Sequence, residues 1–291
     1  MDCIIKGLSR GKKIRFIFAD VTAAANELAG RHGVSGTAAR VLGEALAAAA
    51  LLSADGNRSD ESVQVQLRCD GPLQGFHVEA TGTGDLRGFT QVKSLPGPDR
   101  SGEAAVADVM GRRGILNVTV STPGAVLYSG QVDASPPEVR SALARYYNRS
   151  LQVPTGVELS VRSGGDRLIR AVAIAAQKMP DGDTGAFVGV LEAFQGGQVL
   201  QMLETRQGEE PLWKVFGLPD VESVESRELR FGCRCSSEKV IASIASMTTE
   251  EIREMADAGH PQEVTCHMCG QLYEIEEEIL LEILVNKVGK S

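Results

Sequence analysis

The sequence predicts an α+β fold with three parts: an N-terminal antiparallel-sheet core with helices, a helical linker and a small C-terminal cysteine domain. Short segments with alternating apolar and polar residues dominate the first part, and a few helical segments interrupt them. The texture changes at the turn-forming run that starts at Met179. Four of the six cysteines fall close together near the C-terminal end. We therefore expect domains at residues 1–178, 179–227 and 228–291.

The expected elements of the core follow the spacing of apolar residues. Strands are expected where apolar residues recur at every second position, at residues 14–18, 63–67, 74–81, 86–93, 115–121, 125–132, 157–162 and 167–177. Helices are expected at residues 21–31 and 36–54, where alanine is abundant. A further helix is expected to open at Pro136-Pro137 and to run to about Arg149, because proline suits a first helical turn.

The linker is expected to be partly helical, without a core of its own. A helical stretch over residues 184–206 is interrupted by Gly196-Gly197. An apolar group then follows, formed by Leu212, Trp213, Val215 and Phe216. Two interpretations remain open for this group: it packs on the first domain, or it belongs to a segment that can detach and expose apolar surface.

The C-terminal domain is expected to hold three helices and a hairpin. Val240, Ile241 and Ile244 mark the first helix, and Thr248-x-x-Glu251 is a capping-box pattern that starts the second. Residues 264–269 and 272–275 indicate a hairpin around the second cysteine pair. The last helix is expected at residues 277–288, where two glutamates suit the positive helix N-terminus.

Composition excludes several classes of protein. Hydrophobic residues make up 43% of the 291 residues, which is ordinary for a globular chain. The net charge of −8 makes general nucleic-acid binding improbable, because neutralisation of phosphates supplies most of that affinity. The N-terminal residues lack the apolar region of a secretory signal, and the longest apolar run, Ala45–Leu52, is too short to span a membrane. The expected location is therefore a reducing cytosol.

Two cysteine pairs carry the chemistry. Cys233 and Cys235 form a C-x-C pair, and Cys266 and Cys269 form a C-x-x-C pair after 30 intervening residues. Each pair can deliver two thiolates to one point, and four soft ligands describe a structural zinc site, so we expect one Zn²⁺ per chain. The alternative is four unligated core cysteines.

The other cysteines and the nearby histidine are expected to play no part in this site. His267 lies inside the second pair and could compete as a ligand, but the four cysteines already complete a set, so we expect it to be exposed. Cys3 and Cys69 are expected to be structural or incidental.

The chemistry of these thiols also predicts a redox switch. A disulfide between Cys233 and Cys235 would close a very small, strained ring, and strained bridges behave as labile, regulatory ones. Zinc keeps its ligands as thiolates, the form that oxidants attack. Because structural zinc contributes on the order of 10–16 kcal/mol to folding, its loss on oxidation should unfold a segment of this size.

The cysteine pattern resembles that of the 33 kDa chaperonin family, the redox-regulated heat-shock holdase chaperones of bacteria. The likeness extends over nearly the whole chain, and its supporting motifs are Val63-Gln64-Val65-Gln66-Leu67, Asp70-Gly71-Pro72, Leu86-Arg87-Gly88, Tyr146-Tyr147 with Ser150-x-x-x-Pro154, Gln177-x-Met179-Pro180 and Leu212-Trp213-Lys214-Val215-Phe216. One departure is visible: residues 171–176 lack the glycines that the family often has there, which affects the expected strand geometry.

The resemblance implies a function as well as a fold. It implies a zinc redox-switch domain and ATP-independent binding of unfolded or partly unfolded client proteins during oxidative stress. It also implies that the reduced zinc form is an inactive monomer, and that the oxidised zinc-free form is an active dimer with bridges Cys233–Cys235 and Cys266–Cys269.

Two competing functions fit the residues less well. A zinc ribbon for nucleic acid is disfavoured, since residues 229–291 carry eleven acidic and six basic side chains, a balance of −5. An enzyme is disfavoured because the deaminase, thioredoxin and dinucleotide-binding patterns all fail in spacing or context. His77 is expected to be the only core histidine, and a hydrogen-bonded strand residue rather than a general base.

Overall fold

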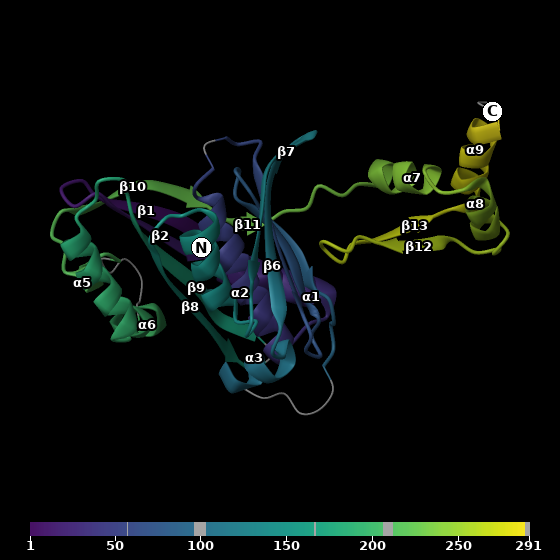
Figure 1. Ribbon diagram of the computed structural model, residues 1–291. Helices are drawn as coiled ribbons and strands as arrows, with labels where there is room; N and C mark the ends of the chain where they lie inside the picture. The colour runs from purple at the N-terminus through teal and green to yellow at the C-terminus, as the bar shows by residue number, and fades with distance from the viewer. Residues whose placement is uncertain (57, 96–102, 166, 206–211, 289–291) are drawn as a thin grey trace. The chain divides into compact units, whose positions relative to one another are not determined.

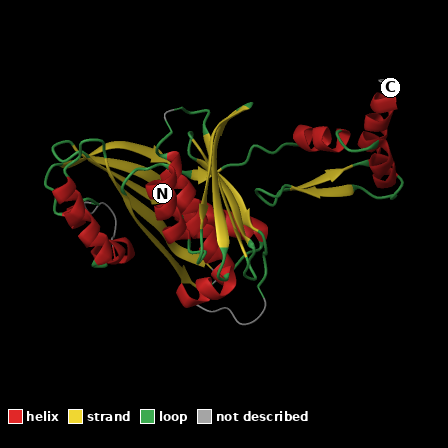
Figure 2. Cartoon of the chain, viewed as in Figure 1, coloured by secondary structure: helices red, strands yellow, loops and turns green. Residues whose placement is uncertain are grey.

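The chain divides into two compact units. The computed structural model describes residues 1–56, 58–95, 103–165, 167–205 and 212–288 (Figure 1). The core unit comprises Met1–Gly232, and the cysteine unit comprises Cys233–Ser291. The core unit is mixed α+β with largely antiparallel sheets, as the sequence predicts (Figure 2).

The first sheet of the core unit has five strands in the order β10-β1-β2-β9-β8, and every neighbouring pair is antiparallel. Its strands are β1 (Cys3–Ser9), β2 (Ile14–Asp20), β8 (Thr155–Gly164), β9 (Arg167–Lys178) and β10 (Val221–Glu228). Strand β9 is regular through residues 171–176, all of which are fully buried. The alanines of this stretch therefore fit a normal strand, and the geometry expected to be affected is regular.

The second sheet has six strands in the order β11-β5-β4-β3-β6-β7. Its strands are β3 (Ser62–Cys69), β4 (Gly75–Thr81), β5 (Asp85–Thr90), β6 (Gly114–Thr122), β7 (Ala125–Asp133) and β11 (Arg230–Phe231). Strand β11 pairs with β5 in parallel, and the other pairs are antiparallel.

Helix α2 forms the centre of the core unit. The helices before the linker are α1 (Thr22–His32), α2 (Gly36–Ser53), α3 (Glu103–Met110) and α4 (Val139–Arg145), which continues into a π-helical turn, η1 (Tyr146–Ser150). Helix α2 contacts strands of both sheets, and its alanines let both sheets approach closely. By length and composition α2 could cross a membrane, but 89% of it is buried inside the protein, which is the position of a core helix.

The predicted linker packs on the face of the first sheet opposite α2. We call α5 (Thr184–Gln195), α6 (Gln198–Thr205) and residues 212–216 the covering segment. Together with the sheet it forms a second apolar cluster, centred on Phe16. The Phe16 ring lies 4.6 Å from the Phe216 ring and 5.6 Å from the Trp213 ring, measured between centroids. The apolar group of the linker is therefore packed on the first domain in this structure.

Several elements differ from the sequence prediction. Strands β1 and β10 and helix α3 were not expected, and β5 ends at Thr90 rather than at residue 93. The helix expected from Pro136 starts at Val139. Residue 206, the last of the expected linker helix, lies outside the described residues. Strand β10 was missed because four of its eight residues are charged, and it forms through pairing with β1.

The cysteine unit is small. It contains α7 (Ser237–Ala245), α8 (Thr249–Ala256), β12 (Gln262–Thr265), β13 (Leu272–Ile275) and α9 (Glu277–Val288). Its buried apolar residues are Ile244, Ile252, Ala256, Ile275, Leu280 and Ile283. The capping box is confirmed: Glu251 N–H donates to Thr248 Oγ1 (3.3 Å), and Thr248 N–H donates to Glu251 Oε2 (2.8 Å).

Candidate metal centre

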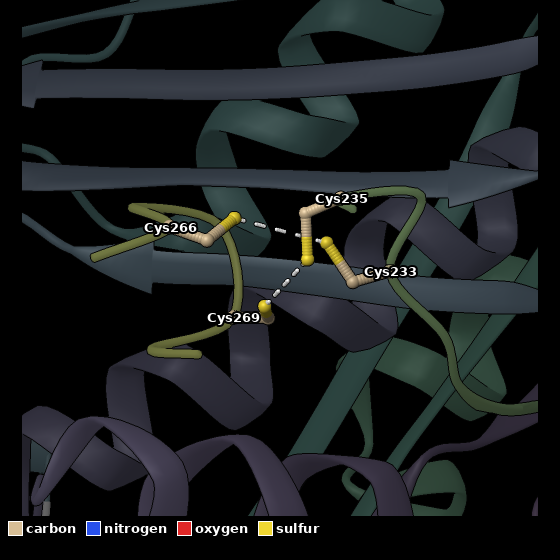
Figure 3. A group of neighbouring side chains, drawn as sticks. All are labelled: Cys233, Cys235, Cys266 and Cys269. Carbon is tan, nitrogen blue, oxygen red and sulfur yellow. Dashed lines mark hydrogen bonds between the residues drawn. The ribbon is translucent and has the colours of Figure 1, made fainter. Parts of the chain in front are cut away.

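Four cysteines from two loops meet in the cysteine unit. Cys233 and Cys235 lie between β11 and α7, and Cys266 and Cys269 lie in the turn between β12 and β13. The four Sγ atoms all lie within 4.8 Å of one another. The Sγ atoms of Cys235 and Cys269 are 3.5 Å apart, and those of Cys233 and Cys266 are 3.9 Å apart (Figure 3). The structure thus brings the four predicted residues together.

The second pair is held by a hairpin turn. Cys266 N–H donates to Gln271 O (2.8 Å) at the base of the turn, and Gly270 N–H donates to Cys266 O (2.8 Å) inside it. Gly270 has φ = 73°, in the left-handed region that favours glycine. This turn places the thiols of Cys266 and Cys269 on the same side of the hairpin turn, and both project toward the first pair (Figure 3).

The first pair ends at a helix N-terminus. Ser236 is the N-cap of α7, and its Oγ accepts a hydrogen bond from Lys239 N–H. Helix α7 therefore starts two residues after Cys235, and its N-cap fixes where the C-x-C loop ends. Lys239 Nζ also donates to Arg234 O, which ties the C-x-C loop to the helix.

The electrostatics of the site favour a bound cation. Burial raises the pKa of the Cys266 thiol and of the Cys269 thiol, whose side chain is only 1% exposed. Without a positive charge these thiols stay protonated at neutral pH, whereas a metal ion stabilises their thiolates. The donor set and its geometry fit such an ion: tetrahedral ligands at about 2.3 Å from zinc lie about 3.8 Å from one another.

One residue near the site was not predicted. Tyr273 lies on β13, and a hydrogen bond with Cys235 raises the pKa of the tyrosine hydroxyl. Groups that hydrogen-bond to ligands orient them and tune the metal. The alternation of residues along β13 could have predicted this position, since Tyr273 lies on the same strand face as the buried Ile275.

The other predicted residues lie away from the cluster. His267 is exposed, as expected, and the group within metal-binding distance comprises the four cysteines. Cys3 lies on β1 and Cys69 at the end of β3, and both are partly buried. Burial raises the pKa of the Cys69 thiol.

The prediction about histidines was wrong. His32, at the end of α1, is 5% exposed, whereas His77 on β4 is only partly buried. His77 was expected to be fully hydrogen-bonded, but its Nε2 has no hydrogen-bond partner among the described residues. Burial lowers the pKa of His77. His32 was missed because it shares the last turn of α1 with exposed residues, and only the tertiary fold covers it.

Fold and site together define an α+β protein with a C-terminal four-cysteine unit of the metal-binding type. The sequence profile of the Hsp33 protein family matches residues 2–276, and the chain belongs to this family. It is 30% identical to a 33 kDa chaperonin of Symbiobacterium thermophilum, covering 97% of both chains. It is 31% identical to a 33 kDa chaperonin of Deinococcus radiodurans, covering 94% of this chain and 95% of that one.

A solved structure shares the fold. The crystal structure of a 33 kDa chaperonin (heat shock protein 33 homolog) from Thermotoga maritima superposes with a TM-score of 0.88 over 99% of both chains, at 24% identity. The relatives' names describe chaperonins rather than enzymes. The resemblance stated from the sequence is confirmed at the level of family and fold.

Proposed function

We propose that this protein is a redox-regulated, ATP-independent holdase that binds unfolded client proteins under oxidative stress. The observation that carries the proposal is the cluster of four cysteine sulfurs within 4.8 Å, placed in a unit with few buried apolar residues. In this proposal the reduced, zinc-bound protein is inactive, and the oxidised, zinc-free protein is active. The family's chaperonin name supports the client class.

In the reduced state, Cys233, Cys235, Cys266 and Cys269 would hold one Zn²⁺. Zinc in such a site is structural and supplies folding free energy, on the order of 10–16 kcal/mol in zinc-finger peptides. Six buried apolar residues form the core of the cysteine unit, and three of them, Ile244, Ile252 and Ile275, come from different elements. A core of this size supplies too little free energy to fold such a unit alone. The folding of the cysteine unit should therefore depend on the metal.

Oxidation would convert the four thiolates into two disulfides and release the zinc. Each disulfide forms as two thiolates lose two electrons, and peroxide or hypochlorite accepts them. Two peroxide molecules take up the four electrons and leave as four hydroxide ions. By family resemblance the bridges are Cys233–Cys235 and Cys266–Cys269. Each bridge requires its sulfurs to approach to about 2.05 Å, which is incompatible with shared tetrahedral coordination.

The covering segment connects this switch to client binding. The chain passes from the covering segment through β10 and β11 to Cys233. We infer that unfolding of the cysteine unit weakens the pairing of these strands and so loosens residues 179–227, the proposed linker. If the segment loosens, the sheet residues beneath it lose their cover; Phe16, Phe18 and Ile174 are each at most 2% exposed in the packed state. Their release would provide apolar surface for clients and for dimerisation of the oxidised form.

The proposed setting is the cytoplasm, without nucleic acid or membrane as a partner. Free thiols that bind zinc and respond to oxidants require a reducing compartment at rest. The balance of −5 over residues 229–291 becomes more negative by two charges when four thiolates bind Zn²⁺, which opposes contact with phosphates.

The test pairs zinc release with light scattering of an aggregating client protein. Reduced protein should hold about one zinc per chain and protect poorly, whereas protein treated with peroxide at raised temperature should lose zinc and suppress aggregation. If the oxidised, zinc-free protein leaves aggregation unchanged, the holdase proposal fails.

Two cysteine variants test the ligand set separately. Cys266→Ser should weaken zinc binding strongly, because one thiolate of the four is lost. Cys69→Ser is the matched control, since Cys69 lies on β3 outside the cluster, and it should keep about one zinc. Full zinc affinity in Cys266→Ser would show that the ligand assignment is wrong.

A further inference from the structure

Strand β7 forms an open edge of the six-stranded sheet. It pairs with β6 on one side, and no described strand pairs with its other side (Figure 2). Along an edge strand, every second residue directs its backbone N–H and C=O away from the partner strand. Seven consecutive residues of β7, 125–131, are exposed or partly exposed. The strand therefore offers unpaired backbone groups along most of its length.

The β7 edge lacks the features that normally block pairing with another strand. Residues 125–132 contain neither a charged residue nor a proline. Strand β10, an edge strand of the other sheet, has four charged residues among eight. Because charged side chains and prolines are the usual protection of edge strands, β10 is protected and β7 is open.

Apolar side chains are exposed on the same stretch. Val126 is 67% exposed, Leu127 52% and Tyr128 38%. Leu127 is the extra residue of a β-bulge, since Val120 pairs with Tyr128 and Ser121 pairs with Val126. An open backbone edge beside exposed apolar side chains is the combination that binds an extended chain by strand addition.

We propose that the β7 edge captures an extended segment of an unfolded polypeptide, which adds to the sheet as a further strand. The inference rests on the proposed holdase function and adds a second contact to the apolar surface that the covering segment would release on oxidation. The edge alone, which is open in the packed state too, would hold a client too weakly for activity. Backbone hydrogen bonds are independent of sequence, which suits a protein whose clients share only unfolded chain. The exposed Val126, Leu127 and Tyr128 then contact the apolar side chains that unfolded clients expose.

A flexible client fits this edge better than a second copy of the protein. In a second copy, β7 would carry the same bulge at Leu127, and because a bulge disrupts the ladder locally, two such edges would pair less regularly than one edge with a flexible chain. Tyr128 Oη hydrogen-bonds to Ser150 Oγ (2.6 Å), which holds β7 against η1. An unfolded segment has no fixed bulge and can follow the edge.

The test compares substitutions to lysine at a leucine and an isoleucine of similar exposure. Leu127→Lys alters the β7 edge, and Ile169→Lys, at 56% exposure on β9, is the matched control. Each oxidised, zinc-free full-length variant is titrated with fluorescently labelled, reduced and carboxymethylated α-lactalbumin, a permanently unfolded and acidic protein without free thiols. We expect Leu127→Lys to raise the Kd by on the order of tenfold and Ile169→Lys to leave it unchanged. Added lysine attracts an acidic probe, so charge alone cannot produce the loss.

A photo-crosslinker at position 127 gives a second measurement that does not depend on the lysine variant folding. It should crosslink to α-lactalbumin, and the same group at position 169 should not. Equal Kd values for Leu127→Lys and the unaltered protein, or crosslinking at 169 without crosslinking at 127, would overturn the inference. A loss of dimer in sedimentation with client affinity intact would also overturn it, because the edge would then bind a second copy. If the oxidised unaltered protein fails to bind α-lactalbumin at all, the holdase function itself is refuted.

Discussion

The packing of Trp213 on Gly7 predicts that one methyl group can loosen the covering segment. A Cβ atom at Gly7 would lie 2.6 Å from Cε2 and 2.8 Å from Cζ2 of Trp213. Both distances are shorter than any normal carbon–carbon contact, and Trp213 is only 6% exposed, with Phe16 and Phe216 on the same cluster. In Gly7→Ala the indole must therefore move, and its hydrogen bond from Nε1 to Ser223 Oγ (3.1 Å) should lengthen or break.

The cost follows from overpacking. Extra methyl groups in a well-packed site typically cost about 1–3 kcal/mol. If this free energy destabilises only the state in which the covering segment is packed on the sheet, the population with the segment undocked rises about 5- to 150-fold. Under the proposed function, reduced Gly7→Ala should then bind clients more strongly than the reduced unaltered protein.

Trp213 is the only tryptophan in the chain, so its fluorescence reports on this segment alone. Gly7→Ala should shift the emission to longer wavelength and increase quenching by iodide or acrylamide. The matched control is Gly189→Ala in α5, where a Cβ meets nothing within 4 Å; alanine should stabilise that helix by up to about 1 kcal/mol and reduce quenching. If Gly7→Ala and the unaltered protein have the same emission and quenching, the steric argument is refuted.

Three further changes have separate readouts. Thr248→Ala removes the capping box and destabilises α8 by about 1 kcal/mol. Because folding and zinc binding are coupled, the zinc affinity, measured with a competing chelator, should fall about fivefold. An unchanged zinc affinity would contradict this coupling. Asp70 accepts hydrogen bonds from two backbone N–H groups, which hold its pKa below the ordinary value of 3.8, so its charge stabilises the fold above that pH. Asp70→Asn should therefore unfold at a lower urea concentration at pH 7, and the difference from the unaltered protein should shrink as the pH falls below 3.8. The Arg227 guanidinium on β10 donates a hydrogen bond to Gly82 O (2.5 Å), and burial lowers its pKa. Arg227→Ala should lower the free energy of unfolding by about 1.5–3 kcal/mol and speed hydrogen exchange of the β10 amides. Unchanged exchange would show that this contact does not hold the strand.

The parts of the structure that the sequence predicts well are governed by local chemistry. The spacing of Cys266 and Cys269 requires a tight turn, and Gly270 allows its left-handed conformation. The capping box at Thr248 and Glu251 likewise uses groups three residues apart. In each case the interacting atoms are close in the sequence, so the pattern can be recognised without knowledge of the fold.

The parts that the sequence does not predict depend on distant partners. Strand β10 has no apolar alternation, and it is a strand because Val221–Glu228 pairs with Cys3–Ser9, more than 200 residues away. The exposure of β7 is similar: its pattern matches other strands, and only the strand order of the sheet shows that it lies at an edge. The position of Tyr273 beside Cys235 also needs the hairpin to bring the two residues together.

The two units differ in what stabilises them, and this difference decides what a redox switch could change. The core unit encloses α2 between two sheets, and the buried residues of α2 include Val41, Leu46 and Leu51, each 0% exposed. The buried residues of α2 belong to the core unit and the four cysteines to the cysteine unit, so under the proposed function loss of the metal should leave this core folded. Strand β7 belongs to the core unit, so its edge should keep its geometry while the cysteine unit unfolds. A protein built in this way can lose one unit to oxidation and retain a rigid strand edge as the template for an unfolded chain.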